Sequence, residues 1–247
     1  MTTIPVWPRV VADIRCPRTG EPLKLSGCAI PGSRVMATGE SSGSTWQVDL
    51  SVGAAIKAPS AIDTSTGEVL SYQTHTKWYA EQLRDAFERR KNSSNITPTV
   101  TVRSRRGRII LLNCVDHLYG HCLLKLLNCE HHNRLHPDDG ICVLIQPQMR
   151  NLVPAYVSEI WEVPVPLRDG VQWYDSIDTW LQRRFQNYEQ VSVSSAYSHL
   201  SPEYYDLRSF VGHRISTPVC LDGRSPVVHF SCRADRCWGI SVAMQER

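Results

Sequence analysis

Residues 108–115 read RIILLNCV, an almost uninterrupted apolar run of strand length. A strand that is buried on both faces has this pattern, because helices cover a parallel sheet on both sides. Similar short runs occur at 141–147 (ICVLIQP), 158–166 (SEIWEVPVP) and 190–197 (QVSVSSAY). The run at 108–115 therefore predicts the first strand of a mostly parallel sheet.

Helix-like segments alternate with these runs. Residues 118–132 (LYGHCLLKLLNCEHH) have leucines at helical spacing, and 173–188 (WYDSIDTWLQRRFQNY) have an apolar stripe. A short helix is predicted at 201–212 and a fifth strand at 227–232 (VVHFSC). This alternation of strands and helices predicts an α/β layer.

Residues 1–62 differ in composition, being rich in Gly, Ser, Thr and Pro. Turn pairs at Thr19-Gly20, Pro31-Gly32 and Ser42-Gly43 separate short apolar patches, which is typical of a small β-rich module.

A helix is predicted after this module, from about Leu70 to Lys91. Its side chains Trp78, Leu83 and Phe87 fall roughly on one face. The polar segment around Pro98 then predicts a linker.

The composition restricts the class of protein. The 247 residues are 42% hydrophobic and 21% charged with a net charge of +3, as in ordinary soluble globular proteins. No apolar run approaches the ~20 residues that cross a bilayer, so no membrane span is expected. The start, MTTIPVWPRVVADIR, has no secretory signal pattern, so a cytoplasmic location is expected. The nine cysteines are then interpreted as mostly reduced thiols.

Basic residues cluster between Arg84 and Arg108. This segment contains eight basic and two acidic residues. No aromatic ladder or RNA-binding signature accompanies this cluster, so we interpret it as a solvated face. Nucleic acid is therefore not an expected partner.

The loop NCVDHLYGH (113–121) leaves the first strand and enters a helix. Ligands of open α/β sheets bind outside the carboxyl ends of the strands, so this loop is the first candidate site. Its candidate residues are Asn113, Asp116, His117, Tyr119, Gly120 and His121. In a purely structural alternative, Asp116 caps the helix and the histidines pack.

A metal site is not predicted here. His117 and His121 have i, i+4 spacing, but Leu118 stands where the HExxH motif has glutamate. The other histidines of the helix lie roughly 15 Å away at 1.5 Å per residue. No P-loop, GxGxxG or GxSxG motif is present, and no cofactor is predicted. A metal-dependent hydrolase that uses the histidine-rich helix remains a weaker alternative.

Two further segments carry candidate residues. The loop SSAYSH (194–199) offers Ser195 and Tyr197 to a polyhydroxylated ligand, or is simply a polar loop with a helix cap. The segment CPRTGEPL (16–23) has the form of a zinc knuckle, but only Cys28 could join Cys16 locally. A structural zinc ion needs four ligands, so a metal-free knuckle is predicted.

Four segments resemble a bacterial group of glycosyltransferase-like proteins of GT-B architecture, which are distantly similar to fucosyltransferases. They are 112–128 (LNCVDHLYGHCLLKLLN), 160–167 (IWEVPVPL), 194–212 (SSAYSHLSPEYYDLRSFVG) and 230–238 (FSCRADRCW). Through CPRTGEPL, the first sixty residues resemble the zinc-ribbon-like domain shared with the activator subunit of tRNA methyltransferases. Versions of that domain without zinc ligands exist.

The resemblance implies four regions. They are a zinc-ribbon-like module at 1–62, a helix and linker at 63–104, a Rossmann-like acceptor-side domain at 105–221, and the start of a donor domain at 222–247. The segment after Trp238, GISVAMQER, is too short for a nucleotide-binding domain, so a truncated second domain with little or no turnover is expected.

The resemblance also implies partners and roles. The partners are a nucleotide sugar and a hydroxyl acceptor, with Asp116, His117 or His121 orienting or deprotonating the acceptor. Arg233 matches an arginine that faces the donor diphosphate, and Asp235 and Arg236 match neighbouring positions. The alternative is a non-catalytic interaction module that docks on a protein partner through its N-terminal module.

Overall fold

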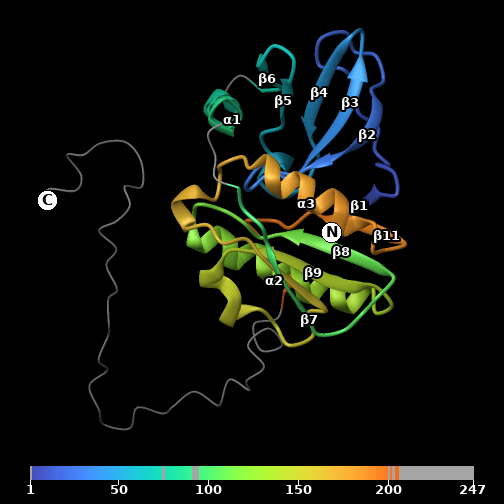
Figure 1. Ribbon diagram of the computed structural model, residues 1–247, viewed down its shortest axis with the longest axis vertical. Coiled ribbons are helices and arrows are strands. Elements are labelled where there is room, and N and C mark those ends of the chain that lie inside the picture. The colour runs from blue at the N-terminus through green and yellow to red at the C-terminus, as the bar shows by residue number, and fades with distance from the viewer. Residues whose placement is uncertain (1, 74–75, 91–94, 200, 202–203, 206–247) are drawn as a thin grey trace, which may run out of the picture. The chain divides into compact units, whose positions relative to one another are not determined.

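The apolar run that begins at Arg108 forms strand β8 (Arg108–Asn113) inside a six-stranded sheet (Figure 1). Strands β9 (Gly140–Ile145) and β11 (Gln190–Ser194) lie parallel to β8, one on each side. Strand β10 (Glu159–Glu162) continues the parallel series beside β9. The fold class is therefore α/β, and the four predicted strands that lie in the described part of the chain are present.

The computed structural model describes residues 2–73, 76–90, 95–199, 201 and 204–205. The predicted strand at 227–232, the predicted second domain at 222–247 and most of the predicted helix at 201–212 lie outside these ranges. The same is true of three predicted site residues: Arg233, Asp235 and Arg236.

Both edges of the large sheet are antiparallel. Strand β1 (Thr3–Trp7) pairs with β11, and β7 (Thr99–Val102) pairs with β10, which makes the sheet mixed. The sequence patterns predict neither edge strand. Strand β7 lies in the predicted linker, and its backbone hydrogen bonds to β10 are what hold those four residues extended.

The order of the parallel strands reverses at β8. The chain adds β9 and β10 on one side of β8 and then adds β11 on its other side. In open α/β sheets, ligand sites form outside the carboxyl ends of the strands at such a reversal. The loops that follow Asn113 and Ser194 border this position.

Two helices cover opposite faces of the large sheet. Ile110 and Leu112 of β8 pack in one cluster with side chains of α2 (Tyr119–Leu135). Leu111 faces the other way and packs with side chains of α3 (Asp175–Phe185). Alternate side chains of a strand point to opposite faces, so residues 109–112 of β8 are all apolar because both faces are buried.

The second sheet is antiparallel, and its strands lie side by side in the same order as in the sequence. Its strands are β2 (Lys24–Ala29), β3 (Met36–Ser41), β4 (Ser44–Asp49), β5 (Ser60–Asp63) and β6 (Val69–Ser71). The predicted turn at Ser42-Gly43 joins β3 to β4, with φ of 49° and 81°. Two consecutive positive φ values are typical of the two-residue hairpin turn that matches strand twist.

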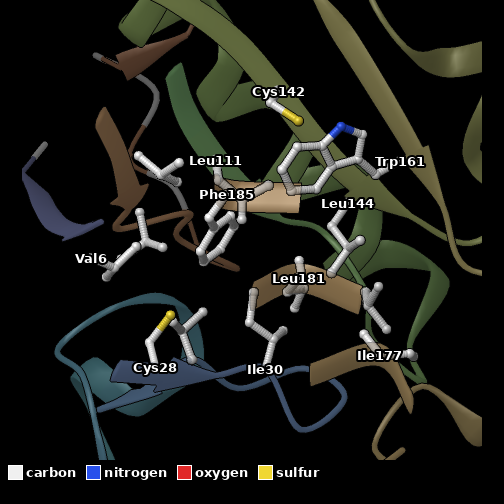
Figure 2. Packing of buried hydrophobic residues seen from close by; sticks show 14 of the residues in the cluster. Val6, Cys28, Ile30, Leu111, Cys142, Leu144, Trp161, Ile177, Leu181 and Phe185 are labelled. Carbon is white, nitrogen blue, oxygen red and sulfur yellow. The ribbon is translucent and has the colours of Figure 1, made fainter. Parts of the chain in front are cut away.

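The two sheets share a core on the α3 face of the large sheet. Figure 2 shows Cys28 and Ile30 from the N-terminal region beside Leu111, Leu181 and Phe185. Each of these five side chains is at most 5% exposed. The β-rich region therefore covers part of this face together with α3.

Helix α1 (Lys77–Arg89) is shorter than predicted, because Val69–Ser71 forms β6 instead. Leu83 and Phe87 are buried as expected, but Trp78 is 62% exposed. The prediction for Trp78 was wrong because Tyr79, four residues before Leu83, occupies the buried face. Three short 3₁₀ helices complete the described elements: η1 (Gly53–Ile56), η4 (Pro147–Leu152) and η5 (Leu167–Asp169).

Two observations concern the predicted class of protein. Within the described ranges, no helix has the length and apolar character needed to cross a membrane. The six cysteines described there are free and buried, Cys16 and Cys28 among them. These two thiols pack in different hydrophobic clusters.

Candidate functional site

A cavity of about 370 Å³ lies beside the loop that follows β11 and the first turn of α2. Aromatic side chains form much of its described lining: Trp78, Tyr79, Tyr197 and Tyr204. Three basic side chains also line it: Lys57, His121 and His199. The cavity thus lies next to the position where the strand order reverses, beside the loop after β11 and the first turn of α2.

The carboxylate of Asp116 lies behind His121 in the loop after β8. One oxygen lies 3.1 Å from Nδ1 of His117 and accepts a hydrogen bond of 3.0 Å from the backbone N–H of Leu118. The other oxygen lies 3.5 Å from Nδ1 of His121 and 3.1 Å from Nζ of Lys125. Both oxygens of this buried carboxylate therefore have donors.

These contacts set the charge of Asp116. Burial alone would raise its pKa, but the ammonium of Lys125 and the hydrogen bonds from His117 and His121 hold the pKa well below its ordinary value. Lys125 is itself fully buried and also donates to the carbonyl of Val115 at 3.0 Å. The carboxylate is thus ionised at neutral pH.

The helix-capping alternative for Asp116 does not describe this arrangement. Leu118 holds the cap position of α2, without a side-chain capping bond, and the helix begins at Tyr119. Asp116 instead organises two histidines and a lysine, with only one oxygen on a backbone N–H.

Packing fixes the backbone of this loop. Gln146 accepts from the N–H of Asp116 at 3.3 Å and donates to the carbonyl of Pro166 at 3.0 Å. Gly170 packs so closely that an added Cβ would lie 2.2 Å from the carbonyl oxygen of Asp116. The loop after β8 is therefore braced by the segment that leads into α3.

The loop after β11 is held as firmly. Asn128 of α2 donates to the carbonyl of Tyr197 at 3.1 Å and accepts from its N–H at 3.0 Å. Ser195 donates to the carbonyl of Thr2 at 2.9 Å. Ala196 adopts φ of 30°, which non-glycine residues seldom do, and these bonds on both sides hold it there.

His121 has the geometry of a general base. Its Nδ1 lies 3.5 Å from a carboxylate oxygen of Asp116, so in the neutral imidazole the proton belongs on Nδ1 and the lone pair on Nε2. The imidazole ring lines the cavity and meets the ring of His199 edge to face, with 5.2 Å between centroids. A hydroxyl group bound in the cavity would have this lone pair as its proton acceptor.

His132 is fully buried and has a structural role. Its Nε2 lies 2.5 Å from the hydroxyl of Ser194, which also accepts from the N–H of Ala196. Burial lowers the pKa of His132 to about 3, and the nearby His131 and His136 contribute. The imidazole of His132 is therefore neutral, and its contact with Ser194 holds the end of β11 in place.

Of the predicted site residues, His121 and Tyr197 line the cavity, with Asp116 and His117 directly behind His121. Asn113 points elsewhere and donates to the carbonyls of Gly32 and Arg34.

Three more predicted residues do not belong to the described cavity lining. Ser195 is buried against Thr2, and Tyr119 is 36% exposed. A Cβ on Gly120 would meet nothing within 4 Å.

Sequence reasoning missed a polar stripe on α2. His121, Lys125, Asn128 and His132 succeed one another at spacings of four, three and four residues, so they share a helix face. The leucines of the same helix dominate its pattern and hide this signal. Lys57 and Trp78 were also missed as site residues, and their spacing in the chain gives no sign that they meet. His199 belongs to the predicted loop SSAYSH (194–199) and lines the cavity.

Tyr79 is supported by a second buried ion pair. The guanidinium of Arg34 lies 3.5 Å from the centroid of the Tyr79 ring. It also donates to Oδ2 of Asp49 at 2.6 Å. This pair fixes the wall of the cavity that α1 contributes.

The site has the parts of an acid–base centre without a metal cluster. Within the residues that the structure describes, no group of three or more His, Cys, Asp or Glu side chains is arranged to hold a metal ion. The cavity combines aromatic faces, one oriented histidine and an ammonium group. Comparisons with protein-family models, curated proteins and solved structures find no match to this chain.

Proposed function

We propose that this chain carries the acceptor-binding side of a glycosyltransferase-like protein, with a Rossmann-like domain of GT-B type. In this proposal, His121 deprotonates an acceptor hydroxyl. The observation that carries it is the contact between the buried carboxylate of Asp116 and Nδ1 of His121, whose ring lines the cavity. The strand order β10-β9-β8-β11 supports the Rossmann-like part, because doubly wound sheets have this order.

The proposed chemistry is transfer of a sugar to a hydroxyl. Nε2 of His121 takes the hydroxyl proton, and Asp116 stabilises the imidazolium that forms. The acceptor oxygen bonds to the anomeric carbon of the donor, while the bond to the nucleoside diphosphate breaks and the diphosphate leaves with the electron pair. Arg233, Asp235 and Arg236 are proposed for the donor side from the resemblance alone, since they lie outside the described residues.

The size and lining of the cavity support a monosaccharide-sized acceptor. A volume of about 370 Å³ falls at the lower end of the range for small-molecule sites. The rings of Trp78 and Tyr197 offer apolar faces to the C–H side of a sugar. Ser198 and the histidines offer polar groups to its hydroxyls.

Nitrogen NMR of the histidine rings tests the assignment of His121 as general base. We expect His121 as the Nδ1–H tautomer, with loss of that preference in Asp116→Asn. Saturation-transfer NMR with a panel of methyl glycosides then tests the site. Binding should be weakened by His121→Asn and unchanged by His136→Gln, a control at the far end of the same helix. An Nε2–H tautomer, or no binding by any glycoside, would contradict the proposal.

A transfer assay gives the second test. Little turnover is expected from this chain, so the assay compares release of nucleoside diphosphate from a panel of nucleotide sugars with the rate without protein. Any release above that rate should be lost in His121→Asn, because a general base usually contributes about 10²–10⁴-fold. Equal rates above the protein-free rate in the two proteins would contradict the assigned role.

The second candidate is a non-catalytic interaction module. The observation that favours it is Trp78, which is 62% exposed at the cavity. Glycoside binding that is unchanged in both His121→Asn and Asp116→Asn, with no nucleotide released from any donor, would favour this candidate.

A further inference from the structure

Among the described residues, the charges around the cavity do not balance. Its described lining includes Lys57, His121 and His199 but no aspartate or glutamate. The carboxylate of Asp116, which contacts His121, is already paired with the buried ammonium of Lys125. One carboxylate and one ammonium cancel, so the charge of Lys57 remains.

Lys57 has no acidic partner in the described part of the chain. No ion pair or hydrogen bond joins its ammonium to a described residue, and its side chain is exposed. It follows η1, whose first residue Gly53 donates to the carbonyl of Ser195 at 2.5 Å. That bond ties the segment that bears Lys57 to the loop after β11.

His199 experiences the same positive environment. Burial lowers its pKa, and the neighbouring His121 and Lys57 lower it further. These two residues are the charged or titratable groups that act on it from α2 and from the segment after η1. His199 is therefore mostly neutral at neutral pH, and a negative charge placed between it and Lys57 would favour its protonation.

We propose that the ligand of this cavity is an anion, namely a hydroxylated ring compound that carries a carboxylate or a phosphate group. Lys57 and His199 meet the negative charge, Trp78 meets a face of the ring, and His121 meets a hydroxyl group. This inference rests on the proposed function and names the class of acceptor. A neutral sugar would leave the charge of Lys57 uncompensated.

Binding should be linked to a proton. Because the anion stabilises protonated His199, the complex takes up protons when it forms near neutral pH. Affinity for the anion should therefore rise as the pH falls from 8 to 6. Calorimetry in two buffers with different ionisation enthalpies measures this uptake, and His199→Gln should remove it.

The direct experiment uses three probes on the full chain: glucose, glucuronate and glucose 6-phosphate. They share a ring, and the two anions distinguish a carboxylate from a phosphate. We expect at least one anion to bind about tenfold more tightly than glucose at low ionic strength, with the preference reduced by 0.5 M salt. Lys57→Met should remove the preference for an anion over glucose, whereas Lys24→Met, at an exposed lysine of β2, should leave that preference unchanged.

The results separate this inference from the proposed function. Equal affinity for all three probes, or a Lys57→Met variant that retains the preference, would overturn the anion inference and leave the proposed function standing. Failure of all three probes to bind would overturn the anion inference, and failure of the methyl glycoside panel as well would overturn the proposed function. Tight anion binding with no role for His121 in the transfer assay would support the anion inference. It would overturn the assignment of His121 as the general base.

Discussion

Two buried carboxylates, Asp49 and Asp116, each have a cation beside them, yet their pKa values shift in opposite directions. Oδ2 of Asp49 accepts from Arg34 at 2.6 Å and from the N–H of Ser60 at 2.8 Å. Its Oδ1 is buried without a hydrogen-bond partner among the described residues. Burial therefore raises the pKa of Asp49 to about 6, despite the guanidinium. Asp116, with donors on both oxygens, has a lowered pKa.

The difference teaches that one cation does not compensate for the burial of a carboxylate. Desolvation acts on the whole group, so the pKa falls only where cations and hydrogen-bond donors together outweigh burial. Asp49 joins strands of the N-terminal sheet to Arg34. Asp116 is the carboxylate that orients a histidine at the cavity, and its full set of donors keeps it ionised.

The largest expected effect comes from Lys125→Met. The change leaves the carboxylate of Asp116 buried without its cation, and breaking a buried pair in this way costs about 3–5 kcal/mol. Urea unfolding at pH 7, followed by tryptophan fluorescence, measures this loss in the free energy of unfolding.

The double variant Lys125→Met with Asp116→Asn is the control for that result. It removes both charges, so most of the lost stability should return. A single variant that loses less than about 1 kcal/mol would show that the histidines alone compensate Asp116, and the contrast with Asp49 would weaken.

The next largest effect is expected from Gly170→Ala. Gly170 has φ of −65°, which alanine adopts freely, so only space is at issue. The new Cβ would lie 2.2 Å from the carbonyl oxygen of Asp116 and 2.7 Å from the N–H nitrogen of His117. The loop must shift, at a cost of about 1–3 kcal/mol.

Ring-nitrogen NMR of the same variant gives a second measurement. Displacement of Asp116 should reduce the Nδ1–H preference of His121. An unchanged tautomer with unchanged stability would show that the loop after β8 adapts readily, which its contacts argue against.

A smaller effect distinguishes the two carboxylates by pH. Because the pKa of folded Asp49 is raised to about 6, the folded protein binds a proton that the unfolded chain does not. Stability from this group therefore increases as the pH falls from 7.5 to 5, by about 1 kcal/mol, since one pKa unit equals 1.36 kcal/mol. Unfolding of the natural chain and of Asp49→Asn over this range measures the difference.

Asp116 gives the matched comparison. Its lowered pKa keeps it ionised in the folded protein across the same range, so its contribution is lost only when the pH falls below the ordinary carboxyl value. If Asp49→Asn and the natural chain had parallel pH profiles between 7.5 and 5, Asp49 would be ionised throughout, as Asp116 is.

The sequence predicted the parts of the fold that have their own periodic signal. RIILLNCV and the later apolar runs give the parallel strands, because burial on both faces leaves an uninterrupted apolar pattern. The edge strands β1 and β7 have no such signal: TVTV at Thr99–Val102 is mostly exposed, and TIPVW at Thr3–Trp7 contains a proline. Their pairing with β11 and β10 depends on contacts distant in the chain.

The candidate site was predictable where it lies in, or directly after, the loops that follow β8 and β11. Asp116 and His121 come after a strand and stand five residues apart, so strand position alone pointed to them. Lys57 and Trp78 reach the cavity from other elements, and nothing local marks them. Lys125 could have been found, since it lies one helical turn after His121 on a polar face that enters an apolar core.

The smallest expected effect has the opposite sign and lies next to the same carboxylate. Gly120 is exposed in the first turn of α2, and a Cβ there would meet nothing within 4 Å. Gly120→Ala should therefore increase the free energy of unfolding by about 0.5 kcal/mol, because alanine loses less backbone entropy in a helix. We compare Gly120→Ala with Gly170→Ala in the same urea titration. The comparison shows whether an added methyl group disturbs the contacts of Asp116 only on the side of Gly170. A loss of stability in Gly120→Ala would mean that the start of α2 must move for Asp116 to hold both histidines.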